Sequence, residues 1–348
     1  MTLTYLVPLR TADGEDVSDL AAYLRTIVEH AEVLVVDGSS PAEIARHRAA
    51  FGPRVCVLPP EQHTTMGKVG NVLTGLRRAR HDRVVIADDD VRYTAGQLAE
   101  VARLLERAEV VRPQNYFTPL PWHARVDAAR TLLARVSGGD WPGTLGVRRQ
   151  AVLDAGGYAG DVMFENLELV RTVQAAGGRE HLALDLLVAR RPPTTAHFAR
   201  QQVRQAYDEL ARPGRLLVSL VVLPAAVTTV RQRRLRALAA GALAAAAAAE
   251  TGRRRAGGRK VFPASASLLA PPWLLWRSAC SWAALAAWVR GGVKYRDVRI
   301  RRAATPARVL RRARARQQGS GVSSSAGTRG SSASSVPSRR TSGLALRR

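Results

Sequence analysis

A short apolar run that ends in three consecutive acids constrains this chain more than any other feature. Residues 83–91 read Arg-Val-Val-Ile-Ala-Asp-Asp-Asp-Val. An uninterrupted apolar run of this length predicts a strand that is buried on both faces, as in a parallel sheet. The acids then lie at the carboxyl end of that strand, which is where open α/β sheets bind their ligands.

The three acids have the chemistry of a cation site. Because side chains alternate along an extended chain, we expect Asp88 and Asp90 to point to one side and Asp89 to the other. Two carboxylates on one side favour a hard divalent cation such as Mg²⁺ or Mn²⁺. The alternative is that the acids cap the next helix, but Thr94 and Gln97 supply a capping box for it. We therefore predict a metal-binding or substrate-binding role.

Apolar runs and helical segments alternate along the first part of the chain. Strands are predicted at residues 3–7, 33–36, 55–58 and 84–87, and helices between them at residues 17–30, 41–51 and 69–80. This alternation predicts an α/β fold built on a doubly wound, mostly parallel sheet. Right-handed crossovers then place Asp37, after the second strand, on the same sheet edge as Asp88–Asp90.

The following segment is less regular but continues the predicted domain. We expect a loop at Tyr116–Trp122, a helix at Ala124–Val136 and a Gly-rich turn at residues 137–144. A further helix at Glu165–Ala176 is ended by two glycines. Residues 1–212 are predicted to form this one domain.

Charge divides the chain near residue 210. The formal net charge of +25 comes almost entirely from residues 211–348, which hold 28 Lys and Arg and only two acids. Such asymmetry indicates an anionic partner surface, either a membrane or a nucleic acid. Two cysteines provide no disulfide framework, which fits a reducing compartment. The first residues lack the pattern of a secretory signal.

Three apolar segments follow the predicted domain, at residues 216–230, 237–249 and 261–289. Each is shorter or more interrupted than the roughly 20 clean residues of a spanning helix. The third holds four tryptophans, a residue enriched at membrane interfaces. We predict residues 213–302 to be membrane-associated helices, interfacial or re-entrant. Residues 303–348, rich in Ser, Arg and Gly, are predicted to be a disordered tail.

Several short motifs occur in a fixed order along residues 1–212. They are Val35-Val36-Asp37-Gly38-Ser39, Gly67-Lys68 with Asn71, Asp88-Asp89-Asp90, Gly143 to Arg149 with Gly156-Gly157-Tyr158, Phe164-Glu165-Asn166-Leu167-Glu168-Leu169, and Gln201-Gln202-Val203-Arg204-Gln205. In this order they resemble the family 2 glycosyltransferases, which have the GT-A fold. Each motif alone is common, and their order on a matching β/α pattern carries the resemblance.

The resemblance implies a nucleotide-diphosphate sugar as donor and assigns roles to residues that match the motifs. The implied donor-binding residues are Pro8, Arg10, Asp37, Lys68, Asn71 and Asp88. Asp88 and Asp90 match the metal-holding DxD motif, so the implied cofactor is Mg²⁺ or Mn²⁺ against the diphosphate. Trp141, Gln201 and Arg204 are implied on the acceptor side. The last motif lacks the Trp typical of processive synthases, which argues against a processive polymerase.

The catalytic base needs a new assignment in this chain. Asn166 stands where the family usually has the basic Asp, and an amide cannot accept a proton at neutral pH. Glu165 is adjacent and is our predicted base, with Glu168 as second choice because residues three apart share a helix face. Asp140 is a further candidate. The two glutamates could instead serve only the helix dipole.

These inferences predict a metal-dependent, inverting glycosyltransferase at the cytoplasmic face of the cell membrane. The expected acceptor is a lipid or a lipid-linked glycan, and no nucleic-acid partner is expected. Two alternatives remain at this stage: a nucleotidyltransferase on the same sheet, and a non-enzymatic protein whose basic region binds a membrane or nucleic acid. Metal-dependent hydrolysis of a nucleotide sugar separates them.

Overall fold

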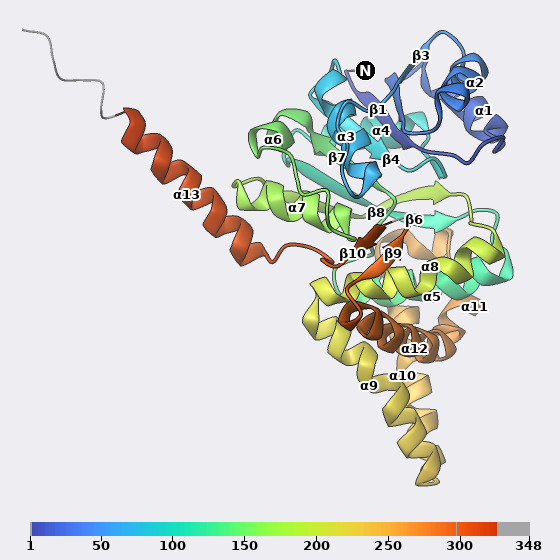
Figure 1. The fold of residues 1–348 in the computed structure, drawn as a ribbon. Helices are drawn as coiled ribbons and strands as arrows, with labels where there is room; N and C mark the ends of the chain where they lie inside the picture. Colours follow the sequence, from blue (N-terminus) through green and yellow to red (C-terminus); the bar gives the residue numbers. More distant parts are fainter. Residues whose placement is uncertain (1, 297, 326–348) are drawn as a thin grey trace, which may run out of the picture.

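The computed structural model describes residues 2–296 and 298–325 of the chain (Figure 1). The strands are β1 (Thr4–Leu9), β2 (Glu32–Asp37), β3 (Val55–Leu58), β4 (Arg83–Ala87), β5 (Val91–Arg92), β6 (Val110–Phe117), β7 (Thr144–Arg148), β8 (Glu180–Arg190), β9 (Val293–Tyr295) and β10 (Val298–Ile300). The helices of the α/β part are α1 (Ser18–Ile27), α2 (Pro41–Phe51), α3 (Gly67–Arg78), α4 (Ala95–Leu104), α5 (Trp122–Val136), α6 (Arg149–Asp154), α7 (Glu165–Ala175) and α8 (Thr195–Tyr207). Behind them come η1 (Asp208–Ala211), α9 (Pro213–Arg231), α10 (Leu235–Arg254), η2 (Arg255–Lys260), α11 (Ala264–Leu268), α12 (Ala270–Val289) and α13 (Ala307–Ser325).

Eight strands form one sheet in the order β3-β2-β1-β4-β7-β6-β8-β5. Strands β1 to β4 pair in parallel, with Leu6 opposite Leu34 on one side and Ile86 on the other. Strand β7 pairs antiparallel to both β4 and β6, whereas β6 and β8 are parallel. The predicted doubly wound, mostly parallel α/β sheet is confirmed, and its carboxyl edge gathers the ends of β1, β2 and β4.

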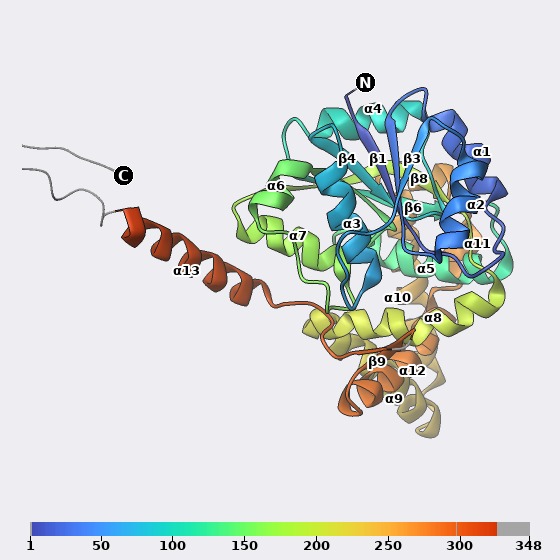
Figure 2. The same cartoon turned by 45° about the horizontal axis from the view of Figure 1, so that its top comes forward.

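The central strand β4 is buried on both faces, as its apolar run predicts. Val85 and Ala87 belong to the core beneath α1, α2 and α4. Val84 and Ile86 belong to the core on the opposite face, where α3, α6 and α7 pack. Figure 2 shows helices on both sides of the sheet. This packing fixes the strand end that carries the three acids.

Helix caps explain two of the sharp transitions near that edge. Thr94 and Gln97 form the predicted capping box at the start of α4, with bonds of 3.0 and 3.3 Å. At α2, Ser40 accepts from the Glu43 backbone N–H at 3.4 Å. The Glu43 side chain does not complete a box, because it binds Arg46 and the Gly14 backbone N–H instead.

The helices behind residue 212 pack largely on the α/β part. Buried Arg135 of α5 donates to the carbonyl oxygens of Leu184 at 2.8 Å, Gly252 at 3.1 Å and Arg255 at 2.6 Å. A Cβ on Gly252 would lie 1.9 Å from the Leu132 carbonyl oxygen, so α10 and α5 touch through their backbones. A small core joins α5 to α10, α11 and α12. Helices α10, α11 and α12 therefore pack directly against the sheet domain.

Helix α9 differs from its neighbours. It is 19 residues long, none of its hydrophobic span is buried, and by length and composition it could cross a membrane. Leu217 and Val218 are each more than 60% exposed. The helix begins at Pro213, three residues before the apolar run, and the expectation of an interfacial or re-entrant segment stays a prediction.

The chain then returns to the sheet domain before it ends. Strands β9 and β10 form a hairpin, and the backbone N–H groups of Met163 and Phe164 donate to the carbonyl oxygens of Arg302 and Ala303. Helix α13 follows and projects outward (Figures 1 and 2). The structure describes a helix over Ala307–Ser325, where the sequence predicts the first part of a disordered tail. Residues 326–348 lie outside the described residues.

Candidate active site

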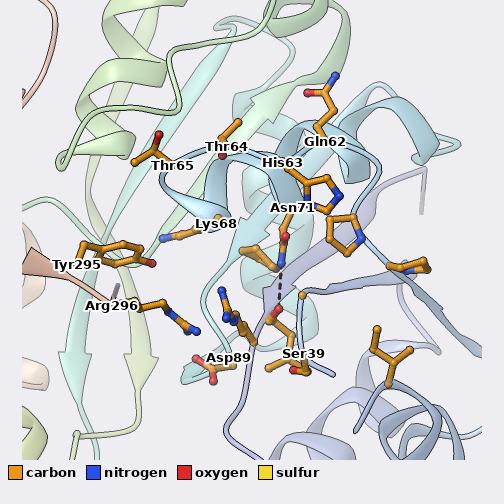
Figure 3. A pocket seen from close by; sticks show the side chains of 18 of the residues that line it. Ser39, Gln62, His63, Thr64, Thr65, Lys68, Asn71, Asp89, Tyr295 and Arg296 are labelled. Carbon is orange, nitrogen blue, oxygen red and sulfur yellow. Dashed lines mark hydrogen bonds between the residues drawn. The ribbon is translucent and has the colours of Figure 1, made fainter. Parts of the chain in front are cut away.

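A cavity of about 770 Å³ lies at the carboxyl ends of β1, β2 and β4. Its volume falls within the range of small-molecule sites. Pro8 and Arg10 line it at the end of β1, Gly38 and Ser39 line it just after β2, and the loop before α3 adds His63 and its neighbours. In Figure 3, Tyr295 and Arg296 reach the cavity from the side opposite to His63 and Ser39. The cavity lies where the fold predicts a ligand site.

Lys68 joins two acids at the floor of this cavity. Its Nζ lies 2.6 Å from Asp88 Oδ1 and 2.6 Å from Glu165 Oε1. Burial alone would lower the pKa of Lys68, but the two carboxylates raise the pKa above its ordinary value. Lys68 is therefore a fixed cation between a residue of the acidic stretch and the predicted base.

Asp90 lies beside Asp88, and one arginine binds both acids. Arg190 Nε donates to its two carboxylate oxygens at 2.9 and 2.8 Å, and Arg190 Nη2 lies 3.3 Å from Asp88 Oδ2. The pKa of Asp90 is raised, first by burial and then by Asp88, against the opposing effect of Arg190. Asp90 thus has a cation partner from the same chain.

Asp89 and Asp88 both line the cavity, whereas Asp90 does not. The predicted pairing of Asp88 with Asp90 assumed continued strand alternation, but β4 ends at Ala87 and a turn follows. Asp89 is exposed to solvent at the cavity mouth, yet desolvation by the surrounding protein, then Asp90 and Asp88, raise its pKa to about 6. A divalent ion would lower this repulsion between carboxylates.

The residues present fit a cation that is shared with a substrate. Over the described part of the chain, His, Cys, Asp and Glu form no group of three or more that could hold a metal alone. Mg²⁺ is commonly bound through one or two carboxylates together with substrate phosphates. Asp88 and Asp89 supply two such carboxylates beside the cavity.

Two predicted donor-binding residues have structural partners. The Asp37 side chain is fully buried, accepts from the Ser39 backbone N–H at 3.0 Å and lies 2.6 Å from His47 Nδ1. It does not line the cavity, so a direct role is not supported by its position. Asn71 lines the cavity, but its amide donates to the carbonyl oxygens of Leu9 and Val36 at 2.9 Å each. It thereby ties β1 to β2 at the site.

A second cavity of about 160 Å³ adjoins the first, since Lys68 and Asp88 line both. Glu165, Asn166 and Trp141 line it as well. Asn166 donates to the Pro142 carbonyl oxygen at 2.9 Å, which orders the loop that follows Asp140. Trp141 packs edge-on to Phe164 at 5.1 Å. The predicted acceptor-side loop and the predicted base therefore meet here.

Two other predicted bases are held away from a proton-transfer role. Glu168 is fully buried and accepts from the Thr305 backbone N–H at 2.6 Å, so it does not share a site with Glu165. The segment around Thr305 covers that face of α7. Helical periodicity in the sequence does not reveal a contact with so distant a segment. Asp140 lines the second cavity but binds Arg130 at 2.5 Å and Thr131 at 2.8 Å, and its pKa is lowered. Burial would raise that pKa, but Arg130 outweighs it.

The α8 motif is only partly directed at the site. Arg204 lines the first cavity and lies 5.7 Å from the Tyr295 ring centroid, whereas Gln201 lines neither cavity described here. Gln205, one turn later, lines the second cavity. Tyr295 and Arg296 were not predicted at the site, because the hairpin that brings them to the cavity is distant in sequence. One signal in the sequence pointed to them: they lie in a short polar stretch that follows the apolar helix α12.

Comparison with known families defines the class of protein. Residues 17–141 match the model of the family described as Glycosyl transferase family 2. That segment contains strands β2 to β6, Lys68 and the acidic stretch. The match identifies a glycosyltransferase family 2 domain over about a third of the chain, and the sheet that carries it has the GT-A fold. No curated protein matches the chain.

Solved structures of sugar transferases are similar in fold. A mannosyltransferase from Pyrobaculum calidifontis, in complex with GDP-Man and Mn²⁺, is 20% identical with a TM-score of 0.44, covering 94% of this chain and 81% of its own. Mannosyl-3-phosphoglycerate synthase from Rubrobacter xylanophilus is 16% identical with a TM-score of 0.41, covering 58% and 71%. Glucosyl-3-phosphoglycerate synthase from Mycobacterium tuberculosis, with Mn²⁺, UDP and phosphoglyceric acid, is 19% identical with a TM-score of 0.39, covering 57% and 75%. None of these similarities assigns a substrate to this chain.

Proposed function

We propose that this enzyme transfers a sugar, with inversion, from a nucleoside diphosphate sugar to an acceptor at the cytoplasmic face of a membrane. The observation that carries the proposal is the meeting of two cavities at the Lys68 ion pairs. The larger cavity has room for a nucleotide sugar, and the smaller one holds the predicted base.

On the donor side, Lys68 is placed to offset the charge of the departing diphosphate, because it is a fixed cation at the cavity floor. Asp88 and Asp89 would hold Mg²⁺ or Mn²⁺, which would supply further charge neutralisation to the diphosphate when bound. Arg10, Arg204 and Arg296 add guanidinium groups around the same cavity. Asp90 acts indirectly, by holding Arg190 beside Asp88.

On the acceptor side, Glu165 is the proposed general base. It lines the smaller cavity, and its Oε1 is already oriented by Lys68. A base on the acceptor side removes the proton from the incoming hydroxyl while the diphosphate leaves on the donor side. This division suits a single displacement at the sugar carbon, with inversion.

The membrane part of the proposal depends on the surface behind the site. Helix α9 exposes its apolar residues, and Trp276, Trp282 and Trp288 of α12 are each more than 40% exposed. Tryptophan at an apolar surface is typical of the membrane–water boundary. The basic residues of this region would bind an anionic leaflet, at about 1 kcal/mol each. A lipid or lipid-linked glycan is the proposed acceptor.

Thermal unfolding of the purified full chain tests the donor site. A nucleoside diphosphate such as GDP or UDP should raise the Tm when Mn²⁺ is present. At 100 times its Kd, binding adds roughly 2.7 kcal/mol to the free energy of unfolding. Lys68→Met should reduce the effect, whereas Arg80→Gln, at an exposed site, should retain it. The rate of nucleotide-sugar hydrolysis should likewise fall in Lys68→Met and stay at the parental value in Arg80→Gln. Absence of both nucleotide binding and hydrolysis across GDP- and UDP-sugars would contradict the proposal.

A further inference from the structure

Arg277 is a buried guanidinium without a carboxylate partner among the described residues. It is the one charged residue in α12, its residue exposure is 3%, and it lines the smaller cavity. Nη2 lies 3.4 Å from Gln205 Oε1, while Nε and Nη1 have no hydrogen-bond partner in the part of the chain that the structure describes. The guanidinium lies 5.1 Å from the Trp273 ring centroid, which offsets part of the cost of burying the charge but leaves Nε and Nη1 without hydrogen-bond acceptors among the described residues.

Two further arginines enter the same cavity from the start of α9. Arg212 and Arg215 share Glu209, with Arg212 Nη2 at 3.0 Å and Arg215 Nε at 3.5 Å. Arg212 Nε is buried and has no partner over the described residues. One carboxylate therefore serves two guanidinium groups, and a third, Arg277, has none.

The remaining charges of the cavity do not neutralise this group. Lys68, Arg130 and Arg190 each have their own carboxylate partners. The nearby acid Asp208 has its pKa raised to about 8, first by burial and then by Glu165, so it is mostly neutral at pH 7. The cavity wall formed by α12 and the start of α9 thus carries uncompensated positive charge.

We propose that Arg277, with Arg212 and Arg215, binds a phosphate group of the acceptor. The proposal rests on the transferase function above and specifies the acceptor class. Guanidinium groups bind phosphate oxygens in a planar, two-point geometry, which matches the unpaired Nε and Nη atoms. The cavity of about 160 Å³ equals roughly five water volumes, enough for the five heavy atoms of a phosphate.

The position of the arginines allows two sources of that phosphate. Arg212 and Arg215 lie where the exposed apolar helix α9 begins, so a lipid phosphate could reach them from a membrane surface. A soluble phosphorylated acceptor could enter the same cavity. The chemistry recognised is the same in both cases, and competition experiments separate them.

Calorimetric titration of inorganic phosphate into the purified full chain tests the site. Arg277→Gln should weaken phosphate binding at least tenfold, Arg277→Lys should restore part of it, and Arg290→Gln should bind like the parent. Arg290 is the matched control because it is an exposed arginine at the end of the same helix. Titration with the donor cavity filled by a nucleoside diphosphate and Mn²⁺ removes any contribution from that cavity.

Stability gives a readout that distinguishes an anion site from a structural arginine. Arg277→Met should keep or raise the Tm without phosphate, because an unpaired buried charge is removed. A folded Arg277→Gln protein with parental phosphate affinity would overturn the proposal, as would a large loss of Tm in both Arg277→Met and Arg277→Lys.

Displacement of bound phosphate identifies its source. Displacement by a polyprenyl phosphate in phosphatidylcholine vesicles would assign the site to a lipid, and displacement by glycerol 3-phosphate alone would assign it to a soluble acceptor. Displacement by neither would overturn the acceptor role. If the chain binds phosphate through Arg277 but binds no nucleoside diphosphate, the anion site is supported and the proposed transferase function is refuted.

Discussion

Asp208 should make the folded protein less stable as pH rises through neutrality. Its ordinary pKa of 3.8 is raised to about 8, first by burial and then by the nearby Glu165. One carboxylate oxygen is buried without a hydrogen-bond partner among the described residues. The folded chain therefore keeps a proton that the unfolded chain releases.

The sign and size follow from proton linkage. Between pH 4 and 8 the folded state binds more protons at Asp208, so the free energy of unfolding falls by up to about 1.4 kcal/mol per pH unit. At pH 7 the accumulated cost is at most about 4 kcal/mol, and partial solvent access reduces it. The stabilisation is complete below the unfolded pKa and is lost as pH reaches the folded one.

Asp208→Asn removes the titration while keeping the side-chain shape. We expect the variant and the parent to have similar Tm values near pH 4.5, and the variant to gain roughly 2–4 °C over the parent per pH unit up to about pH 8. Asp185→Asn, at an exposed position of β8, controls for the loss of one negative charge. Differential scanning calorimetry at half-unit pH steps measures the effect. Parallel pH profiles for parent and Asp208→Asn would refute the reasoning.

Four further outcomes are expected. Glu165→Gln should lower sugar transfer roughly 10²–10⁴-fold while nucleotide affinity, measured by calorimetry, persists; an unchanged rate would remove Glu165 as base. Asp89→Asn should weaken Mn²⁺-dependent nucleotide binding more than Asp90→Asn does, and the reverse order would restore the predicted Asp88–Asp90 pair. Gly143→Ala should impair Mn²⁺-dependent binding, because its Cβ would lie 2.5 Å from Asp88 Oδ2; parental binding would show that the loop yields. Leu217→Glu should reduce the fraction of the chain that rises with membrane vesicles in a flotation gradient, and unaltered flotation would exclude α9 as the membrane contact.

Local sequence signals predicted the elements around the site but not the partners of its side chains. The apolar run before Asp88 and the capping box at Thr94 each depend on neighbouring residues, and both hold in the structure. Arg190 binds acids about a hundred positions earlier in the chain, a pairing set by the β5–β8 register, in which Arg190 lies opposite Val91. No periodicity in one segment reports such a partner.

Two expectations differ from the structure in detail for the same reason. Asp88 and Asp90 share Arg190, as strand alternation predicts, but Asp89 and not Asp90 lines the cavity with Asp88, because a turn follows Ala87. Glu168 was assigned to the face of Glu165, but the backbone of Thr305 covers it. In each case a distant segment or a turn outweighed a local pattern, because burial and hydrogen bonding are settled by the whole fold.

The return of the chain across the sheet domain has a consequence for biosynthesis. The Tyr207 hydroxyl donates to the Arg301 carbonyl oxygen at 2.6 Å, and Phe164 is held by Ala303. Tyr295 and Arg296 supply a wall of the donor cavity, and Arg277 a wall of its neighbour. A chain leaves the ribosome from its amino end, so the sheet can form well before these walls emerge. During that interval the nascent chain has its acids and Lys68, whereas the cavity walls supplied by Arg277, Tyr295 and Arg296 are added only after helices α9 and α10 have been made.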